Sequence, residues 1–357
     1  MQIALICDTH WGVRNDSPIM LDYLKQSSEW FIEELKDMGI TNCIHLGDLV
    51  DRRKYINFVT SNRLRSDFLD KLEQNEINTH IIPGNHDEYY KNTHIINSLD
   101  ELVVGKYNYI KTYTEAKTVS FDSVDILLLP WLCESNFESS MNAIQETKAH
   151  IVMGHLELKG FEMYKGSVND HGMDHSLFNK FDIVCTGHFH HRSTKGNILY
   201  LGAFGEYTWS DYNDPRGFSI LDTETREIQY IDNPYKSHIK LWYNDLNKQI
   251  DEIMVELDKV RTNKFTKPSV KVIVTNKTNP YWFDLFIGQL EQLSPADIQV
   301  VDDHLNLDLE QDDTIISDVE DTITIFKKYI DGLNGKFSKP KLNDIVKQLY
   351  NEAMQIE

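Results

Sequence analysis

Five short motifs rich in Asp, Asn and His each follow an apolar run that is typical of a buried β-strand. In α/β folds, side chains just beyond the carboxyl ends of strands carry the chemistry, because parallel strands bring them to one edge of the sheet. One such motif has an ordinary explanation as a turn, but five in order favour a common site. The motifs are Asp8-Thr9-His10, Gly47-Asp48-Leu49-Val50-Asp51, Gly84-Asn85-His86-Asp87, Gly154-His155-Leu156-Glu157 and Gly187-His188-Phe189-His190.

The residue types in these motifs are those that hold two divalent cations side by side. Two cations ~3.5–4 Å apart need several carboxylate and imidazole ligands, one of which bridges both ions. Mixed nitrogen and oxygen ligation suits Mn²⁺, Fe or Zn²⁺ better than Ca²⁺ or an all-oxygen Mg²⁺ site. We therefore expect a dinuclear centre that binds a phosphate and activates water for displacement at phosphorus.

The order of the elements predicts an α/β fold. Over the first 90 residues, strand-like runs alternate with amphipathic helices at Met20–Met38 and Phe58–Leu72, which implies parallel strands. From Tyr107 onward the pattern is mainly strand-like, with one clear helix at Phe137–Thr147. Strands in both halves favour two stacked sheets with helices outside.

Asn233-Pro234 marks the expected end of this sandwich. Helical spacing from Leu246 to Val260 then precedes a strand, a helix and a second strand, which together predict a small α/β module. The expected parts are a catalytic domain at 1–235, a capping domain at 236–302, an acidic linker at 303–314 and a helical hairpin at 315–357.

The charge of the chain argues at first against nucleic acid as a partner. Its 36 Lys and Arg stand against 56 Asp and Glu, and a formal net charge of −20 should repel polyphosphate. Half of this excess lies in residues 291–331, which contain 2 basic and 12 acidic residues and are typical of a solvated linker. The sequence also predicts no signal peptide and no membrane span, and hence an intracellular protein.

In order and spacing, the five motifs resemble the DxH, GDxxD, GNHD or GNHE, GH and GHxH motifs of the calcineurin-like metallophosphoesterase superfamily. Within it the chain is most similar to the nuclease subunits of SbcCD-type repair complexes, the Mre-eleven family, and especially to those of T-even-type phages. Segments 154–161, 213–218 and 269–275 carry this closer resemblance. It implies a four-layer α/β/β/α sandwich with a small α/β capping domain and C-terminal helices.

The resemblance also implies a role for each motif residue. It implies a hydrolase with two Mn²⁺ ions, or Mg²⁺ or another divalent cation, that cleaves DNA phosphodiesters with a metal-activated hydroxide. His86 would be the catalytic histidine. Asp51, at a position where some family members have a histidine, would orient His86 or support the metal ligands from outside. Asp87 is expected to fix the loop, and His238, which lacks a motif, to lie at the surface. The implied ligands are Asp8, His10 and His190 for one metal, Asn85, His155 and His188 for the other, and Asp48 as the bridge.

The implied function is a DNA nuclease of a recombination and repair complex, with exonuclease activity on double-stranded ends and endonuclease activity. DNA contacts are expected from basic and aromatic loop residues beside the motifs, although ordinary charged loops have the same composition. The candidates are Arg14, Arg52, Arg53, Lys54, Tyr89, Lys91, His191 and Arg192.

Two other functions stay open from the sequence. The segment 47–52 resembles the GDxVDRG motif of phosphoprotein phosphatases, but Arg53 replaces its glycine, and Asp87 stands where that group has Glu. A non-catalytic scaffold with the same fold would have lost metal ligands, and all the ligand positions are filled in these motifs.

The hairpin at 315–357 is expected to dock on a partner, because two short apolar helices are unstable alone. The resemblance implies an SbcC-type coiled-coil ATPase that supplies much of the DNA-binding surface; packing of the helices on their own capping domain is the alternative. The resemblance further implies a homodimer through Met20–Met38 and Phe58–Leu72, and a cytoplasmic location, in the host cell if the chain is phage-encoded.

Overall fold

The structure is a computed structural model that describes residues 1–164, 166–302 and 341–342. Residues 1–304 form one compact unit, and residues 305–357 form a second. The predicted linker and helical hairpin therefore lie outside the described residues, apart from 341–342. In the part of the chain that the structure describes, none of the helices combines the length and apolarity that a bilayer span requires.

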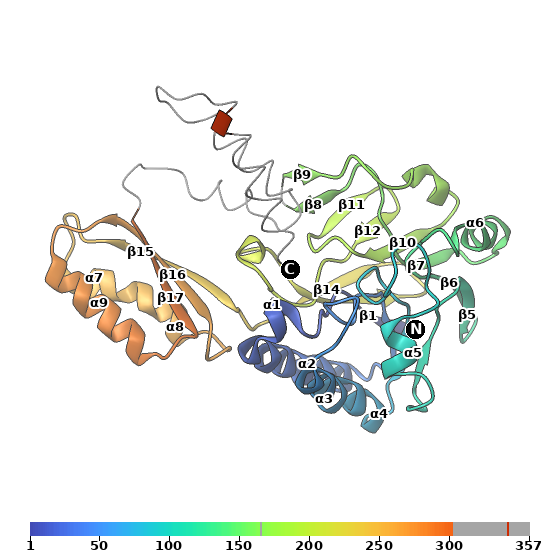
Figure 1. The fold of residues 1–357 in the computed structure, drawn as a ribbon, viewed down its shortest axis with the longest axis horizontal. Coiled ribbons are helices and arrows are strands. Elements are labelled where there is room, and N and C mark those ends of the chain that lie inside the picture. Colours follow the sequence, from blue (N-terminus) through green and yellow to red (C-terminus); the bar gives the residue numbers. More distant parts are fainter. Residues whose placement is uncertain (165, 303–340, 343–357) are drawn as a thin grey trace. The chain divides into compact units, whose positions relative to one another are not determined.

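A six-stranded mixed sheet carries the first three motifs (Figure 1). Its strands are β1 (Gln2–Ile6), β2 (Asn42–His45), β3 (Asn78–Ile81), β4 (Ile110–Thr112), β13 (Gly217–Asp222) and β14 (Ile228–Asp232). The order is β14-β13-β1-β2-β3-β4. Strands β1 to β4 run parallel, whereas β13 is antiparallel to both of its neighbours.

A second six-stranded sheet carries the last two motifs. Its strands are β5 (Lys117–Phe121), β6 (Val124–Leu129), β7 (Ile151–His155), β10 (Ile183–Gly187), β11 (Ser193–Lys195) and β12 (Ile198–Tyr200). The order is β11-β12-β10-β7-β6-β5, with a parallel centre and antiparallel edge strands β11 and β5. A small hairpin of β8 (Glu162–Tyr164) and β9 (Ser167–Val168) lies between β7 and β10 in the chain.

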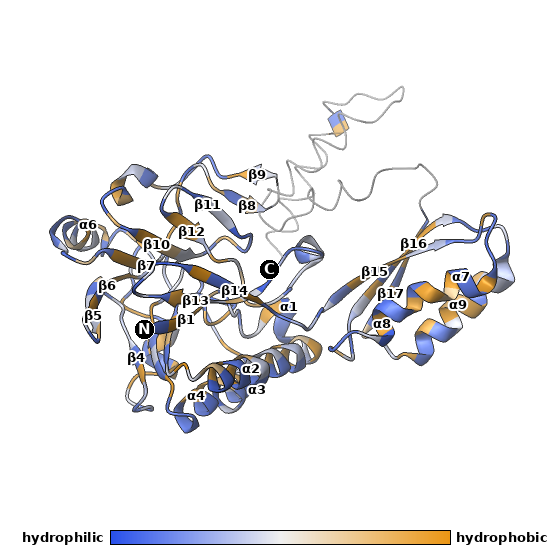
Figure 2. Cartoon of the chain, turned by 180° about the vertical axis from the view of Figure 1, so that it is seen from behind, coloured by the Kyte–Doolittle hydropathy of each residue, from blue (hydrophilic) through white to orange (hydrophobic). Residues whose placement is uncertain are grey.

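The two large sheets stack face to face around an apolar core. Leu5 and Ile44 of the first sheet and Leu128 and Ile151 of the second are fully buried in one cluster. The next residue along each strand points to the opposite face, where helices cover it. Figure 2 shows strongly hydrophobic residues along β7, β10 and β13. Each sheet therefore buries one face against the other sheet and the opposite face under helices, and this produces a layered sandwich.

Helices cover the outer face of each sheet. The main ones are α2 (Pro18–Met38), α3 (Phe58–Leu64) and α4 (Asp70–Gln74) on the first sheet and α6 (Phe137–Glu146) on the second; short segments are α1 (Val13–Asp16) and α5 (Ser98–Leu102). The predicted single helix Phe58–Leu72 is interrupted by a π-helical turn at Arg65–Leu69. The predicted four-layer α/β/β/α sandwich is confirmed.

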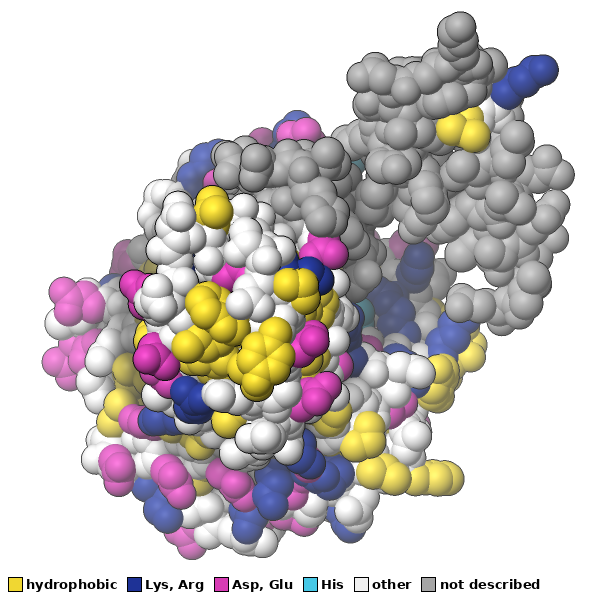
Figure 3. All heavy atoms as spheres, turned by 90° about the vertical axis from the view of Figure 1, so that its left-hand side faces the viewer, with side chains coloured by type: hydrophobic (Ala, Val, Ile, Leu, Met, Phe, Trp, Pro, Cys, Tyr) yellow, Lys and Arg dark blue, Asp and Glu magenta, His cyan; other side chains and the backbone are white. Residues whose placement is uncertain are grey.

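A smaller α/β module follows the sandwich within the same unit. Its sheet consists of the parallel strands β15 (His238–Asn244), β16 (Ser269–Asn276) and β17 (Asp297–Asp302), in that order. Three helices, α7 (Ile250–Met254), α8 (Asp258–Arg261) and α9 (Pro280–Gln292), accompany this sheet and share its apolar core. Figure 3 looks onto this module and shows apolar side chains at its surface; Val255 and Tyr281 are among the exposed ones.

Two details of this module differ from the sequence-based expectation. Strand β15 was not predicted, although Ile239, Leu241 and Tyr243 alternate along it and are buried. The predicted helix was to include Leu246, which is 48% exposed and lies before the helical segments begin at Ile250. A short alternating run next to a Pro is easily read as a connection, and this is why the strand was missed.

Candidate metal centre

The five motifs meet at one edge of the sandwich, where the parallel strands of both sheets end. The first three follow β1, β2 and β3, the fourth overlaps the end of β7, and the fifth overlaps the end of β10. Segments far apart in the sequence thus supply one site. The donor atoms form three overlapping groups, and the atoms within each group lie within 4.8 Å of one another. The groups are Asp8, His10 and His190; His10, Asp48 and His86; and Asp48, His155 and His188.

The first group places two imidazole nitrogens against each other. The Nε2 atoms of His10 and His190 are 3.1 Å apart, and His10 Nε2 is 3.7 Å from Oδ2 of Asp48. Burial lowers the pKa of His10 well below its usual value, so its ring is neutral and can offer a lone pair. Lone pairs that converge in this way fit a cation between them.

The group of Asp48, His155 and His188, with Asn85 beside it, shows the same feature. His155 Nδ1 lies 2.7 Å from the Leu46 carbonyl oxygen, to which it donates a hydrogen bond, so a neutral His155 ring has its lone pair on Nε2. That Nε2 lies 3.0 Å from Oδ1 of Asn85 and 3.5 Å from Oδ2 of Asp48. Oδ1 of Asn85 is also 2.9 Å from Nδ1 of His188. Imidazole nitrogens thus face amide and carboxylate oxygens, an arrangement that fits a divalent cation.

Asp48 belongs to two of the three groups of donor atoms, together with His10 and His86 in one and with His155 and His188 in the other. Burial alone would raise the pKa of this carboxyl, but the imidazoles of His155, His86 and His10 outweigh burial and hold the pKa well below its usual range. Burial likewise would lower the pKa of His155, yet the Asp48 and Asp8 carboxylates raise it to about 9. The site therefore favours positive charge beside Asp48.

Backbone geometry holds these ligands in position. Asp8, His10, Asp48 and His188 have φ values of 52°, 46°, 53° and 90°, in the left-handed region that costs a non-glycine residue of order 1–3 kcal/mol. The glycine before Asp48 allows close approach, because a Cβ atom on Gly47 would lie 2.5 Å from Nδ1 of His155. Strained backbone at several ligands is typical of functional sites.

His86 and its neighbours complete the third motif. The His86 ring lies 4.9 Å from the His10 ring, and its Nδ1 is 2.5 Å from the backbone carbonyl oxygen of Asp51. Asp51 thus orients His86 through its main chain, whereas its carboxylate lies 3.6 Å from Nδ1 of His10. The Asp87 carboxylate accepts hydrogen bonds from the amides of Gly84, Leu49 and Val50, so it ties the second and third loops together as expected.

A family model decides which group of enzymes this geometry belongs to. The model of the calcineurin-like phosphoesterases matches residues 1–192, more than half of the chain. The chain belongs to the calcineurin-like phosphoesterase family. The match covers all five motifs and confirms the resemblance predicted from them.

The relatives of this phosphoesterase are nuclease subunits. The chain is 34% identical to exonuclease subunit 1 of Enterobacteria phage T4 over 361 residues, which cover 99% of this chain and 100% of the relative. It is 26% identical to the SbcD subunit of nuclease SbcCD from Staphylococcus saprophyticus over 267 residues, 64% of this chain and 67% of that one. The SbcD subunit from Staphylococcus epidermidis is 30% identical over 100 residues, 26% of each chain.

Two residues that the motifs did not indicate also shape the phosphoesterase site. The Tyr207 hydroxyl donates to the backbone carbonyl of Asp8, 2.7 Å away, and its ring packs edge-on against His10 and His190. The Trp131 ring lies 5.0 Å from that of His188 and 6.0 Å from that of His155. Trp131 lies two residues after the end of β6, so its position after a strand was the one available signal.

The residues predicted to contact DNA fall into two groups. Arg52 pairs with Asp16, His191 with Asp214, and Arg192 with Asp232. These three have acidic partners within the chain. The others lie at or near the surface of loops: Arg14, Lys54 and Lys91 are exposed, and Arg53 and Tyr89 are half-buried.

A buried ion-pair network supports the loop that carries Tyr207. Arg216, which is 1% exposed, lies 2.7 Å from a carboxylate oxygen of Asp211 and 2.8 Å from one of Asp214. Burial would raise the pKa of Asp211, but Arg216 outweighs it and lowers the pKa to about 2. Asp211 also accepts the backbone N–H of Tyr207 at 2.7 Å. Through Asp211, the network thus connects Arg216 to Tyr207, whose hydroxyl contacts the loop that carries Asp8 and His10.

Arg216→Met is expected to destabilise the fold by about 3–5 kcal/mol, because the buried Asp211 carboxylate loses its counter-charge and the half-buried Asp214 loses one of its partners. Chemical denaturation measures this free energy of unfolding. The matched control is Arg261→Ala, which removes an exposed pair with Asp258 and should cost less than about 1 kcal/mol. Equal and small losses in both variants would contradict a stabilising role for the buried network.

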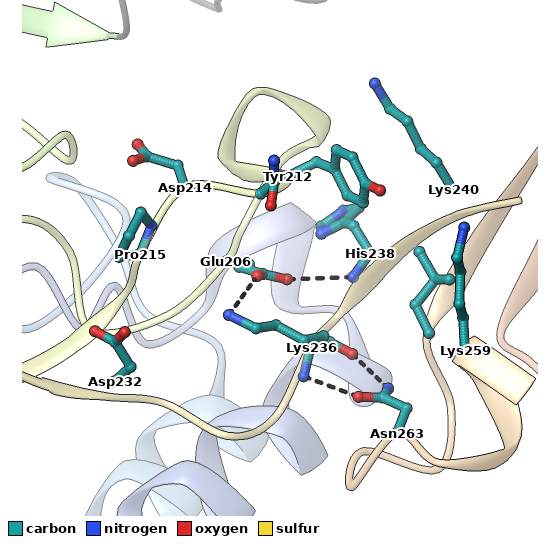
Figure 4. Close-up of a pocket in the computed structure, with 12 residues that line it drawn as sticks. Glu206, Tyr212, Asp214, Pro215, Asp232, Lys236, His238, Lys240, Lys259 and Asn263 are labelled. Atoms are coloured by element: carbon teal, nitrogen blue, oxygen red, sulfur yellow. Dashed lines mark hydrogen bonds and ion pairs between the residues drawn. The ribbon is translucent and has the colours of Figure 1, made fainter. Parts of the chain in front are cut away.

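A hollow of about 360 Å³ lies where the sandwich meets the smaller module (Figure 4). Buried Glu206 accepts the backbone N–H groups of Ser237 and His238 and pairs with Lys236 at 3.2 Å. Lys240 and Lys259 also line this hollow. His238 is buried, not at the surface as predicted, because its ring packs on Trp209.

Proposed function

We propose that this chain is the Mn²⁺-dependent DNA nuclease subunit of an SbcCD-type recombination and repair complex. The observation that carries the proposal is a full set of converging ligands around Asp48, in a chain similar over its whole length to a phage exonuclease subunit. We expect exonuclease activity on double-stranded ends together with endonuclease activity, in the cytoplasm, which is that of the host cell if the chain is phage-encoded.

In this proposal Asp8, His10 and His190 hold one Mn²⁺, Asn85, His155 and His188 hold the other, and Asp48 bridges them. When bound, the cations supply Lewis acidity toward the phosphate and lower the pKa of a water molecule. His86 has its Nδ1 engaged with the Asp51 carbonyl, which leaves Nε2 to stabilise or protonate the leaving oxygen. Tyr207 keeps the first ligand loop in place.

The net charge of −20 is compatible with DNA under this proposal. Asp8 and Asp48 are neutralised by the cations, and the dense acidic run lies far from the motifs in the sequence. Exposed Arg14, Lys54 and Lys91 are the first candidates for phosphate contacts, and residues 236–302 form a capping domain that adds DNA-binding surface. We expect DNA binding by the isolated subunit to be weak and to fall steeply with salt.

Removal of divalent cations with a chelator is expected to abolish DNA cleavage, because the acceptor cluster then lacks the charge that balances it. Mn²⁺ should restore cleavage, whereas Ca²⁺, which prefers oxygen ligands, should restore little. Gel electrophoresis of linear DNA incubated with each added metal measures this cleavage. Undiminished cleavage in excess chelator would exclude the metal-dependent function.

The partner in this proposal is an SbcC-type ATPase that docks on residues 315–357, with homodimerisation through α2 and α3. Deletion of residues 315–357 is expected to abolish co-purification with the ATPase and to leave cleavage of a small phosphodiester unchanged, since all proposed ligands lie before residue 191. Full-length chain serves as the control. Unchanged ATPase binding by the shortened chain would reject the docking segment.

A further inference from the structure

A second cavity, of about 140 Å³, lies directly beside the metal centre. His155, a proposed metal ligand, forms part of its wall, as does Trp131, whose ring also packs against His188. A group in this cavity is therefore separated from the reacting phosphate by no more than one ligand side chain. In a nucleotide, the base is separated from its phosphate by one sugar, so base and phosphate could occupy the cavity and the metal centre together.

The wall of the cavity is chemically suited to a flat, uncharged group. Trp131, Phe137 and Met173 supply two aromatic rings and a thioether, which are favourable surfaces for the π-face of a nucleobase. Glu157 adds a carboxylate, which repels phosphate and accepts hydrogen bonds. Each nucleobase has N–H donors on its edge in addition to its π-face, and so matches both features.

The cavity is held rigid by its own backbone. The amide of Met173 donates to the Glu157 carbonyl at 2.9 Å, and the amide of Lys159 donates to the Met173 carbonyl at 3.0 Å. A Cβ atom on Gly172 would lie 2.4 Å from that Glu157 carbonyl oxygen, so glycine is needed there. On the other side, the amide of Trp131 donates to the Pro83 carbonyl, and the Asn136 side chain donates to the Trp131 carbonyl. A preformed cavity binds its occupant without an ordering cost.

From these observations we propose that the cavity between Trp131, Phe137 and Met173 binds one unpaired nucleobase next to the phosphodiester that is cleaved. This inference rests on the proposed nuclease function and names the part of the substrate that the site reads. It follows that the strand must be single at the point of cleavage, because a base inside a duplex cannot enter the cavity. Glu157 accepts a hydrogen bond from the edge of that base.

The test compares a single-stranded oligothymidylate with an abasic oligomer of the same length and backbone, with Mn²⁺ present. For the unaltered chain, kcat/KM should be higher on thymidylate by roughly tenfold, the value expected for stacking of one base on aromatic side chains. Phe137→Ala should lose most of this preference and leave the abasic rate unchanged; Phe137 is 48% exposed, so its removal should not disturb folding. Glu157→Ala should also lower the preference for thymidylate over the abasic oligomer.

Tyr281→Ala is the matched control, an exposed aromatic side chain on α9 outside the cavity, and should leave both rates unchanged. Equal rates of the unaltered chain on the two oligomers, or an equal loss on both in Phe137→Ala, would overturn the base-binding proposal while the nuclease function stands. If neither oligomer is cleaved but a chromogenic phosphodiester is, the proposed DNA nuclease function fails and the base-binding site fails with it.

Discussion

Asp48→Ala is expected to abolish both high-affinity Mn²⁺ binding and cleavage. Among the described residues, Asp48 is the carboxylate that occurs in two of the groups of donor atoms, so in the proposed dinuclear centre its removal would take a ligand from both cations. Since cation charge is worth several kcal/mol in the transition state, kcat/KM should fall by at least roughly a thousandfold. Isothermal titration with Mn²⁺ and cleavage of a small phosphodiester measure the two effects.

Asp182→Ala is the control for Asp48→Ala. Asp182 is half exposed, lies at the start of β10 away from the ligand edge, and should tolerate substitution with no loss of metal or activity. If Asp48→Ala kept the Mn²⁺ affinity and stoichiometry of the unaltered chain, Asp48 would not be a bridging ligand, and the dinuclear centre would have to be reassigned.

His86→Ala is expected to separate metal binding from catalysis. His86 is oriented by the Asp51 carbonyl and stands next to His10, but it is not in the proposed ligand set. Loss of a general acid or transition-state donor costs typically ~10²–10⁴-fold in rate. We expect kcat to fall in that range while Mn²⁺ binding stays at the level of the unaltered chain.

His150→Ala is the matched histidine control for His86→Ala, because the His150 side chain is 68% exposed on the opposite end of β7. It should leave both metal binding and rate unchanged. Loss of Mn²⁺ binding in His86→Ala would make His86 a ligand, and an unchanged rate would remove it from the mechanism altogether.

The sequence was most informative where strands end. Motifs after β1, β2, β3, β7 and β10 were predicted to meet, and they do, because parallel strands place their carboxyl ends on one edge. The ligand set that the sequence indicated by position stays a prediction, although its side chains lie together. Periodicity likewise predicted both sheets and α2, since burial on one face imposes a regular spacing of apolar residues.

The parts that the sequence did not reveal depend on packing between distant segments. Tyr207 reaches the Asp8 carbonyl across almost 200 residues, and no local pattern encodes this contact. Trp131 has no ligand chemistry, so only its place after β6 set it apart. Asp51 was expected to orient His86 or to support the metal ligands, and its contact with His86 is made by its carbonyl oxygen, an atom that every residue type has.

A comparison of substrates is the most direct test of the proposed DNA nuclease function. Purified chain with Mn²⁺ is incubated with linear duplex DNA, with single-stranded DNA and with a phosphoserine peptide, which represents the phosphoprotein phosphatases of the same superfamily. For a DNA nuclease we expect that DNA is cleaved and that the peptide keeps its phosphate. Release of phosphate from the peptide, with both DNA substrates intact, would contradict it.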